Sequence, residues 1–452
     1  MTALDSRRPS REDRVQIGRE ARARVPLAAH ADWTPALDRP DPAALLEEQA
    51  RTRIPELVPV RYGRMLVSPF SFYRGAALPM AADLATTPTS GIQVQLGGDA
   101  HLSNFGLFAS PERDELFDMN DFDETLPGPW EWDVKRLAAS LVVAGRGRGF
   151  DAHETRQIAR AAVRSYRERM HEYAEMRAID VYYSLVDVTG IMAYVAKRAR
   201  PHLQATVKSA AHHDAFHELP KLTELVDGRR RIIDHPPMVT HVPWIDRIVL
   251  AEGLDAYRLT LQEDRRVLVD RYAVVDVALK VVGVGSVGLG AIILLMDGGG
   301  GHDPLFLQAK EAEASVFERF LGRSEFDHHG QRVIAGQRRL QAASDILLGW
   351  TTGSRGRHLY LRQLQDQKGG AVIDAMTKED LATWGELCGW ALARAHARSG
   401  DPAAIAGYLG TDPEFDEAIG RFATTYADQT GRDHAALAAA VKAGRVPAET
   451  GV

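Results

Sequence analysis

Two acidic loops carry residues whose types and spacing could do chemistry. In GGDAHLSNFG, Asp99 and Asn104 stand five positions apart, directly after the strand-like segment IQVQL. Phosphoryl-transfer enzymes use this separation: the aspartate accepts a proton from a hydroxyl nucleophile, and the asparagine oxygen helps to hold Mg²⁺. NDFDE adds Asp121 and Asp123 after another apolar run. Because Mg²⁺ prefers oxygen ligands, we expect Asp99 to be a catalytic base and Asn104, Asp121 and Asp123 to bind the metal ion.

A glycine-rich segment, GVGSVG, lies between two stretches rich in valine, isoleucine and leucine. The branched residues after it favour a second strand over the helix of a dinucleotide-binding fold. In a strand–loop–strand unit, absent side chains let backbone N–H groups approach phosphate oxygens. We therefore expect Gly283, Gly285, Ser286 and Gly288 to contact nucleotide phosphates. A glycine-rich hairpin without a ligand is the alternative.

Lys310 lies near the end of a third predicted strand, in FLQAKEA. Its apolar neighbours predict a buried strand, where a lysine needs a partner; otherwise it would face water at the strand end. A lysine on the third strand that pairs with phosphates and a glutamate is the kinase arrangement. It predicts that Lys310 and Asp121 approach one pocket, within about 15 Å. The candidate acidic partners are Glu311, Glu313 and Glu318, of which Glu313 and Glu318 are better placed if a helix follows.

Other interpretations of these residues remain open. The Asp–Asn spacing also occurs by chance in turns. Asp99, His101 and Asp121 could form a metal site of a hydrolase, although no paired-histidine spacing supports one. Arg74 in FYRG could clamp phosphate, but a structural arginine paired with an acid is slightly favoured. A structural role is also favoured for Arg362.

The surrounding pattern predicts an α+β fold. The segment from about Tyr272 predicts three antiparallel strands, and helical spacing dominates the stretch after Trp132 and the C-terminal part. Two hairpin-like units are expected around the acidic loops. The predicted divisions are an extended N-terminal arm (1–59, with a short helix near 41–52), a catalytic and metal-loop lobe (60–264), a nucleotide-covering sheet (265–365) and C-terminal helices (366–452), which end in a frayed tail after Ala443.

Bulk composition narrows the function classes. The chain has 452 residues, a formal net charge of -6 and one cysteine, Cys388. No dense basic block suggests nucleic-acid binding, and the most apolar stretch is interrupted by glycines and charges, which argues against a membrane span. A single cysteine and an N-terminus without an apolar signal region favour the cytoplasm. The histidine-rich segment from about 200 to 245 is expected to be a solvated insertion.

The motifs resemble those of known families. GGDAHLSNFG resembles the H-G-D-x-H-x-x-N loop of aminoglycoside and choline phosphotransferases, with Gly97 in place of the first histidine. NDFDETLPGPWEWD resembles their second acidic segment, in which a later aspartate, here Asp133, supports the loop. From about residue 15 to 440 the chain also resembles a bacterial family called domain of unknown function 2252, through FYRG, GDAHLSNFG, NDFDE, GVGSVG, KEA and RQLQDQKG.

The resemblance implies a protein-kinase-like two-lobed fold with an unusual motif order. In kinases the glycine loop and lysine come before the catalytic loop, whereas here they follow it, which implies circular permutation. The helix-like segment WALARAHARSG resembles the helix that precedes the phosphotransferase loop. We therefore expect it to lie beside GGDAHLSNFG, with His396 as a packing residue.

The implied function is an ATP- and magnesium-dependent phosphotransferase that acts on a hydroxyl of a small-molecule acceptor. No segment of the A-P-E type follows NDFDE, so a protein acceptor is not expected. A nucleotidyl transferase, a non-catalytic nucleotide-binding regulator and a metal-dependent hydrolase are the alternatives.

Overall fold

The glycine-rich segment connects two strands of a six-stranded antiparallel sheet. The computed structural model describes residues 9–194, 215–242, 247–281, 283–364, 369–370 and 372–451, so His202, His212 and His213 lie outside the described residues. The strand order is β11-β12-β10-β9-β8-β7. Their bounds are Val239–Thr240 (β7), Ala273–Lys280 (β8), Ala291–Asp297 (β9), Pro304–Glu311 (β10), Gly349–Thr352 (β11) and His358–Gln363 (β12).

The three predicted strands, β8, β9 and β10, are antiparallel as expected. Successive side chains of a strand point to opposite faces. Even-numbered positions of β9 such as Leu294 pack with Tyr257 and Leu307 on one face. Ile293 and Phe306 pack on the other.

Short helices cover both faces of this sheet. On the first face lie α12 (Arg247–Leu259) and α13 (Glu263–Val269). On the second lies α11 (Ala215–Leu222), followed by the small hairpin of β5 (Thr223–Val226) and β6 (Arg229–Ile232). Lys310 lies on the second face, together with Phe306, because the preceding residue Ala309 packs on the first face and side chains alternate along the strand.

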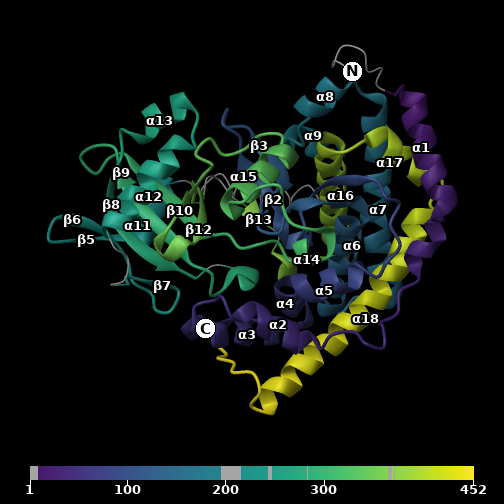
Figure 1. Ribbon diagram of the computed structural model, residues 1–452, viewed down its shortest axis with the longest axis horizontal. Helices are drawn as coiled ribbons and strands as arrows, with labels where there is room; N and C mark the ends of the chain where they lie inside the picture. Colours follow the sequence, from purple (N-terminus) through teal and green to yellow (C-terminus); the bar gives the residue numbers. More distant parts are fainter. Residues whose placement is uncertain are drawn as a thin grey trace.

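A helical body lies beside the sheet and contains the largest hydrophobic cluster of the described residues (Figure 1). Its central helix α16 packs along α7, and α18 crosses α6 and α7. The C-terminal helices thus return to the segment that follows the acidic loops, as predicted. The helices are α6 (Trp130–Gly147), α7 (Ala152–Glu175), α8 (Ala178–Tyr183), α9 (Val188–Tyr194), α16 (Lys378–Ser399), α17 (Pro402–Leu409) and α18 (Glu414–Lys442).

Short strands flank the two acidic loops, which lie between the six-stranded sheet and the helical body. The expected pairing was wrong: β1 (Gln93–Leu96) pairs with β4 (Leu126–Pro129), while β2 (Phe105–Ala109) pairs with β3 (Glu115–Met119) and with β13 (Gly369–Gly370). Both acidic loops are therefore enclosed by the β1–β4 pair instead of lying in separate hairpins. Two helices complete this region, α14 (Glu318–Leu321) and α15 (His329–Leu340).

The N-terminal arm is helical, not extended. Ser10 and Asp13 form a capping box that begins α1 (Arg11–Arg24), which packs on α17. The predicted short helix is α2 (Pro42–Ala50), and it is followed by α3 (Val58–Leu66), α4 (Pro69–Gly75) and α5 (Ala77–Leu84).

The expected frayed tail is wrong as well. Val446 is buried against the arm, and the Glu449 N–H donates to the Pro59 carbonyl. The C-terminal tail therefore packs on the segment around Pro59, whereas α1 lies on another side of the molecule (Figure 1).

Candidate functional site

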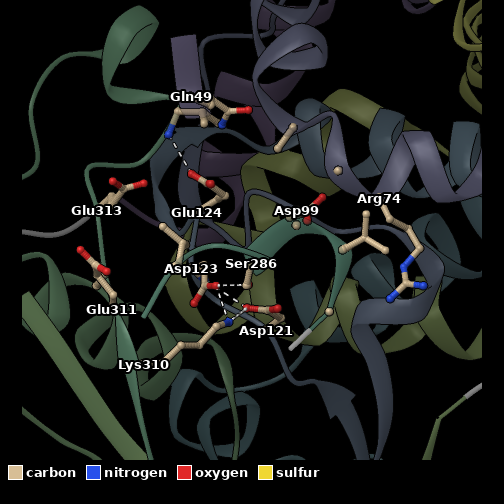
Figure 2. A pocket seen from close by; sticks show the side chains of 18 of the residues that line it. Gln49, Arg74, Asp99, Asp121, Asp123, Glu124, Ser286, Lys310, Glu311 and Glu313 are labelled. Carbon is tan, nitrogen blue, oxygen red and sulfur yellow. Dashed lines mark hydrogen bonds and ion pairs between the residues drawn. The ribbon is translucent and has the colours of Figure 1, made fainter. Parts of the chain in front are cut away.

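One pocket collects almost every residue that the sequence singles out. Its cavity volume is about 170 Å³, and Figure 2 shows the side chains that line it. The predicted residues in its lining are Asp99, Asn104, Asp121, Asp123, Gly283, Gly285, Ser286, Lys310 and Glu313. Gly288 does not line it. Its backbone φ is +87°, and a Cβ at this position would lie 3.1 Å from Arg53 Cβ, so this glycine serves the turn itself.

Lys310 joins the sheet to the second acidic loop. Its side chain is 3% exposed; Nζ contacts Asp123 Oδ2 and lies 3.7 Å from Asp121 Oδ1. The expectation that Lys310 and Asp121 share one pocket is confirmed. The expected glutamate partner is wrong. β10 continues through Glu311, whose side chain accepts from the Gly290 N–H and pairs with Arg357 instead. The next helix begins only at Glu318, which is too late to present a glutamate to Lys310.

The pKa values of Lys310, Asp121 and Asp123 depend on one another's charges. Burial alone would lower the pKa of Lys310, but Asp121 and Asp123 outweigh it and raise that pKa. Burial would raise the pKa of Asp123, but the charge and hydrogen bonds of Lys310 and Tyr360 lower it. For Asp121, burial and the neighbouring Asp123 carboxylate raise the pKa. A cation near Asp121 would relieve that repulsion.

Asp123 ties three parts of the site together. Besides Lys310, its carboxylate accepts hydrogen bonds from Tyr360 Oη (2.6 Å) and Ser286 Oγ (3.2 Å). Both carboxylate oxygens of Asp123 thus have partners: Tyr360 at Oδ1, and Lys310 and Ser286 at Oδ2. Asp121 is the carboxylate with free capacity for a metal ion.

Helices α6 and α16 fix the backbone of the first acidic loop. Asp133 accepts from the N–H groups of Gly97 (2.7 Å) and Gly98 (3.0 Å), and His396 Nε2 lies 3.2 Å from the same carboxylate. Tyr166 in turn contacts His396 Nδ1 at 2.9 Å. The segment WALARAHARSG therefore lies beside GGDAHLSNFG, as predicted, and His396 is a fully buried positioning residue.

Asp99 and Asn104 are held in defined orientations. Asp99 Oδ1 forms an ion pair with the buried Arg136, whose guanidinium stacks on Tyr73, and Asp99 Oδ2 lies 3.6 Å from His101 Nε2. Asn104 Nδ2 donates to the Asp99 carbonyl at 2.8 Å. That bond turns the amide so that its Oδ1 stays available as a ligand.

The N-terminal arm holds the glycine-rich segment in place. Arg53 donates to the carbonyls of Gly285 (2.9 Å) and Val287, and the Ile54 N–H donates to the Gly288 carbonyl at 2.8 Å. Val287 is fully buried. The loop therefore forms a fixed wall of the pocket, packed on the arm.

Two further arginines differ in their roles. Arg362 joins the sheet to the second acidic loop through the Asn120 carbonyl (3.2 Å) and Gln308 Oε1 (3.1 Å), which fits the structural role expected for it. Arg74 lines the pocket, and its Nη2 lies 3.9 Å from the position of a Cβ on Gly283. Within the described ranges no carboxylate lies within 4 Å of the Arg74 guanidinium, so the favoured pairing with an acid is wrong. Figure 2 shows Arg74 on the side of Asp99.

The alternative metal triad does not form. Nowhere in the described parts of the chain do three or more histidine, cysteine, aspartate or glutamate side chains gather in a way that could hold a metal ion. His101 is 3% exposed, and its pKa is well below the usual range because of burial and the charges of Arg136 and Arg74.

Sequence reasoning missed several lining or supporting residues. Tyr360 could have been found, because it alternates with Arg362 on a strand that pairs with the lysine strand. The others are brought in by tertiary packing and carry no local signal. They are Gln49, Arg53 and Arg61 of the arm, Glu124 of the second loop, and Arg136 of α6.

The fold and the site define an α+β protein with a charged pocket between an antiparallel sheet and two acidic loops. The model of the family described as "Uncharacterized protein conserved in bacteria (DUF2252)" matches residues 53–440, and the chain belongs to this family. No curated protein and no solved structure matches the chain. None of the helices in the described ranges has the length and apolar character needed to cross a membrane.

Proposed function

We propose that the protein is an ATP- and magnesium-dependent phosphotransferase that acts on a hydroxyl group of a small-molecule acceptor. The observation that carries the proposal is the junction of Lys310, Asp121 and Ser286 at Asp123, in the pocket that also contains Asp99. A lysine, acidic side chains and a glycine-rich loop are the groups that phosphoryl transfer requires at the nucleotide phosphates.

Each residue has a role in this proposal. Lys310 and the backbone around Gly283 and Gly285 bind the phosphates of ATP. Asp99 orients the acceptor hydroxyl and takes its proton while the acceptor oxygen bonds to the γ-phosphorus and ADP leaves. Arg136 keeps the Asp99 carboxylate oriented. Arg74, next to Gly283, adds a positive charge for the transferred group.

The side chains fit a magnesium ion. Mg²⁺ is commonly held by one or two protein groups, with phosphate and water oxygens completing its shell. Asp121 Oδ1 accepts from the Asp123 N–H at 3.3 Å, and no donor among the described residues reaches its Oδ2; Asn104 Oδ1 is left available by the bond that Nδ2 makes. When bound, the ion would neutralise phosphate charge. Asp123 then serves as the partner of Lys310 and not as a full metal ligand.

A permuted kinase-like architecture belongs to the same proposal. The antiparallel sheet that carries Lys310 would be the nucleotide lobe, and the acidic loops with α6 and α16 the catalytic lobe. The position of α16 beside the first acidic loop supports permutation, because the phosphotransferase helix that WALARAHARSG resembles precedes that loop in sequence.

Binding and transfer are tested separately. Thermal unfolding with and without MgATP tests binding, and an absent shift for the wild type would reject the proposal. Transfer is measured with ATP labelled at the γ- or the α-phosphorus and a set of hydroxyl compounds. Label transfer from the γ position supports phosphoryl transfer, and transfer from the α position supports a nucleotidyl transferase.

Asp99→Asn is the variant that tests the base. It is expected to bind MgATP as the wild type does and to lose transfer by roughly a hundredfold or more. Asp114→Asn, at an exposed aspartate outside the pocket, is the matched control. Wild-type binding without any transfer to any compound would favour a nucleotide-binding regulator.

A further inference from the structure

Two buried arginines, Arg53 of the N-terminal arm and Arg61 of α3, line the pocket without an ion pair to a described carboxylate, although the charge of Glu313 acts on both from a greater distance. They are 7% and 1% exposed. Arg53 donates to the backbone of the glycine-rich segment, and Arg61 Nη2 donates to the Gly75 carbonyl (3.0 Å) and to Gln49 Oε1 (3.4 Å). Among the residues that the structure describes, no carboxylate lies within 4 Å of either guanidinium.

Several donors of these arginines have no partner. Nε of Arg53, and both Nε and Nη1 of Arg61, are buried without a hydrogen bond in the described structure. A buried charge without a counter-ion is strongly destabilising, and each unmet donor adds to that destabilisation. Burial and the neighbouring Arg53 charge also lower the pKa of Arg61 well below its usual range. An anion bound between the two guanidiniums would remove these costs.

Arg53 lies against the glycine-rich segment, and Arg61 lies beside Gln49. Arg61 contacts Gln49, and Figure 2 shows Gln49 and Lys310 at opposite ends of the pocket, with Asp99 between them in height. The phosphate groups assigned to Lys310 therefore leave the part of the pocket beside Arg61 and Gln49 unfilled. Glu124 near this end does not supply the missing charge, because its carboxylate accepts from the Val316 N–H and burial raises its pKa to about 7.

We propose that Arg53 and Arg61, with Gln49, form an anion-binding subsite for an acidic group of the acceptor, either a phosphate or a carboxylate. This rests on the proposed function, since it assigns the opposite end of the pocket to ATP. The acceptor is then a hydroxy compound that also bears an acidic group. Its hydroxyl oxygen bonds to the γ-phosphorus, the bond from that phosphorus to the bridging oxygen of ADP breaks, and the hydroxyl proton passes to Asp99.

The test uses the full chain and two simple probes, inorganic phosphate and acetate. Thermal unfolding is followed with each probe, in the absence and presence of a saturating non-hydrolysable MgATP analogue. The wild type is expected to be stabilised by a probe, with the same shift whether or not the nucleotide is present. The probe that gives the larger thermal shift at equal concentration shows whether the subsite prefers a phosphate or a carboxylate group.

Arg61→Gln is the diagnostic variant, because Arg53 also holds the glycine-rich segment. This substitution is expected to weaken probe binding roughly ten- to hundredfold, because it removes one or two charge-assisted hydrogen bonds. The affinity for the MgATP analogue is expected to stay within about twofold of the wild type. Arg51→Gln, at an exposed arginine of the same arm, is the control. If Arg61→Gln does not fold, Gln49→Ala and Arg61→Lys replace it, and both are expected to weaken probe binding less.

Three results would overturn the subsite. The first is a wild type that neither probe stabilises. The second is competition between probe and nucleotide analogue, which would place the arginines in the nucleotide site. The third is an unchanged probe effect in Arg61→Gln, which would leave Glu313 as an internal counter-charge. Failure of the proposed function has a different signature, because the nucleotide analogue would then give no shift while the probe effect persists.

Discussion

Lys310→Met is expected to destabilise the protein in a way that depends on Asp123. Methionine keeps most of the length and apolar character of lysine but removes its charge. Asp121 and Asp123 would then lose the cation that they contact and keep only the charge of Arg362, and their side chains are only 32% and 21% exposed. Breaking a buried pair costs roughly 3–5 kcal/mol. Because both carboxylates retain some solvent, we expect about 3 kcal/mol.

The pH dependence of this loss follows from the pKa shifts. The lowered pKa of Asp123 contributes stability above its ordinary value of 3.8 that is lost as the pH falls through its folded pKa. The raised pKa of Lys310 contributes stability below its ordinary value of 10.5 that is lost at higher pH. The difference between wild type and Lys310→Met should thus be largest near neutral pH and shrink in acid. Urea unfolding at neutral and acidic pH measures it.

A double-mutant cycle gives the decisive comparison. In Lys310→Met with Asp123→Asn, the uncompensated carboxylate is removed as well, so the double variant should be at least about 2 kcal/mol more stable than the sum of the single losses predicts. Lys378→Met is the control, because its pair with Glu154 is exposed and exposed ion pairs add little stability. Strict additivity would refute the buried-pair argument. Unchanged stabilisation of Lys310→Met by MgATP would refute the role of Lys310 at the phosphates.

Three further predictions concern the pocket walls. Arg74→Gln should weaken binding of ATP roughly tenfold but leave ADP binding nearly unchanged, because its unpaired guanidinium is assigned to the γ-phosphate; calorimetry with both nucleotides checks this, and equal losses would contradict it. Glu124→Gln should be more stable than the wild type above about pH 7 by about 2 kcal/mol. The raised pKa of Glu124 makes its contribution complete below its ordinary 4.5 and lost as the pH rises through about 7, and denaturation across this range measures the difference. Gly98→Ala should lower the melting temperature and impair MgATP binding, because φ is +85° and a Cβ would lie 2.4 Å from the Glu124 carbonyl oxygen; a wild-type melting curve would contradict the strain.

The elements with strong local patterns could be predicted from the sequence. Alternating branched residues gave the strands on both sides of the glycine-rich segment, and helical spacing gave α6, α7 and α16. Asp121 was correctly expected to share one pocket with Lys310, although the partner expected for this lysine was a glutamate. Such features are set by neighbours in the chain, which a single sequence displays.

The remaining features depend on contacts between distant segments. β1 pairs with β4 and not with its neighbour in sequence, β2. This pairing joins segments about 30 residues apart and encloses both acidic loops. The acidic partner of Lys310 is Asp123, 187 positions away, whereas a search near the lysine could find only glutamates. Arg53 and Arg61 enter the site because the arm packs beneath the glycine-rich segment. No periodicity or spacing marks such residues.

The order of the motifs along the chain does not weaken the chemical argument. The electric field in the pocket depends on where charges lie, and Asp123, Ser286 and Lys310 meet although the acidic loop comes first in the sequence. What the reversed order changes is the support of the site. The first acidic loop is held by His396 through Asp133, and the glycine-rich segment is held by Arg53, so parts close to both ends of the chain fix the two sides of the pocket. The pocket therefore requires the segment around Arg53 and helix α16 to be packed against the rest of the chain.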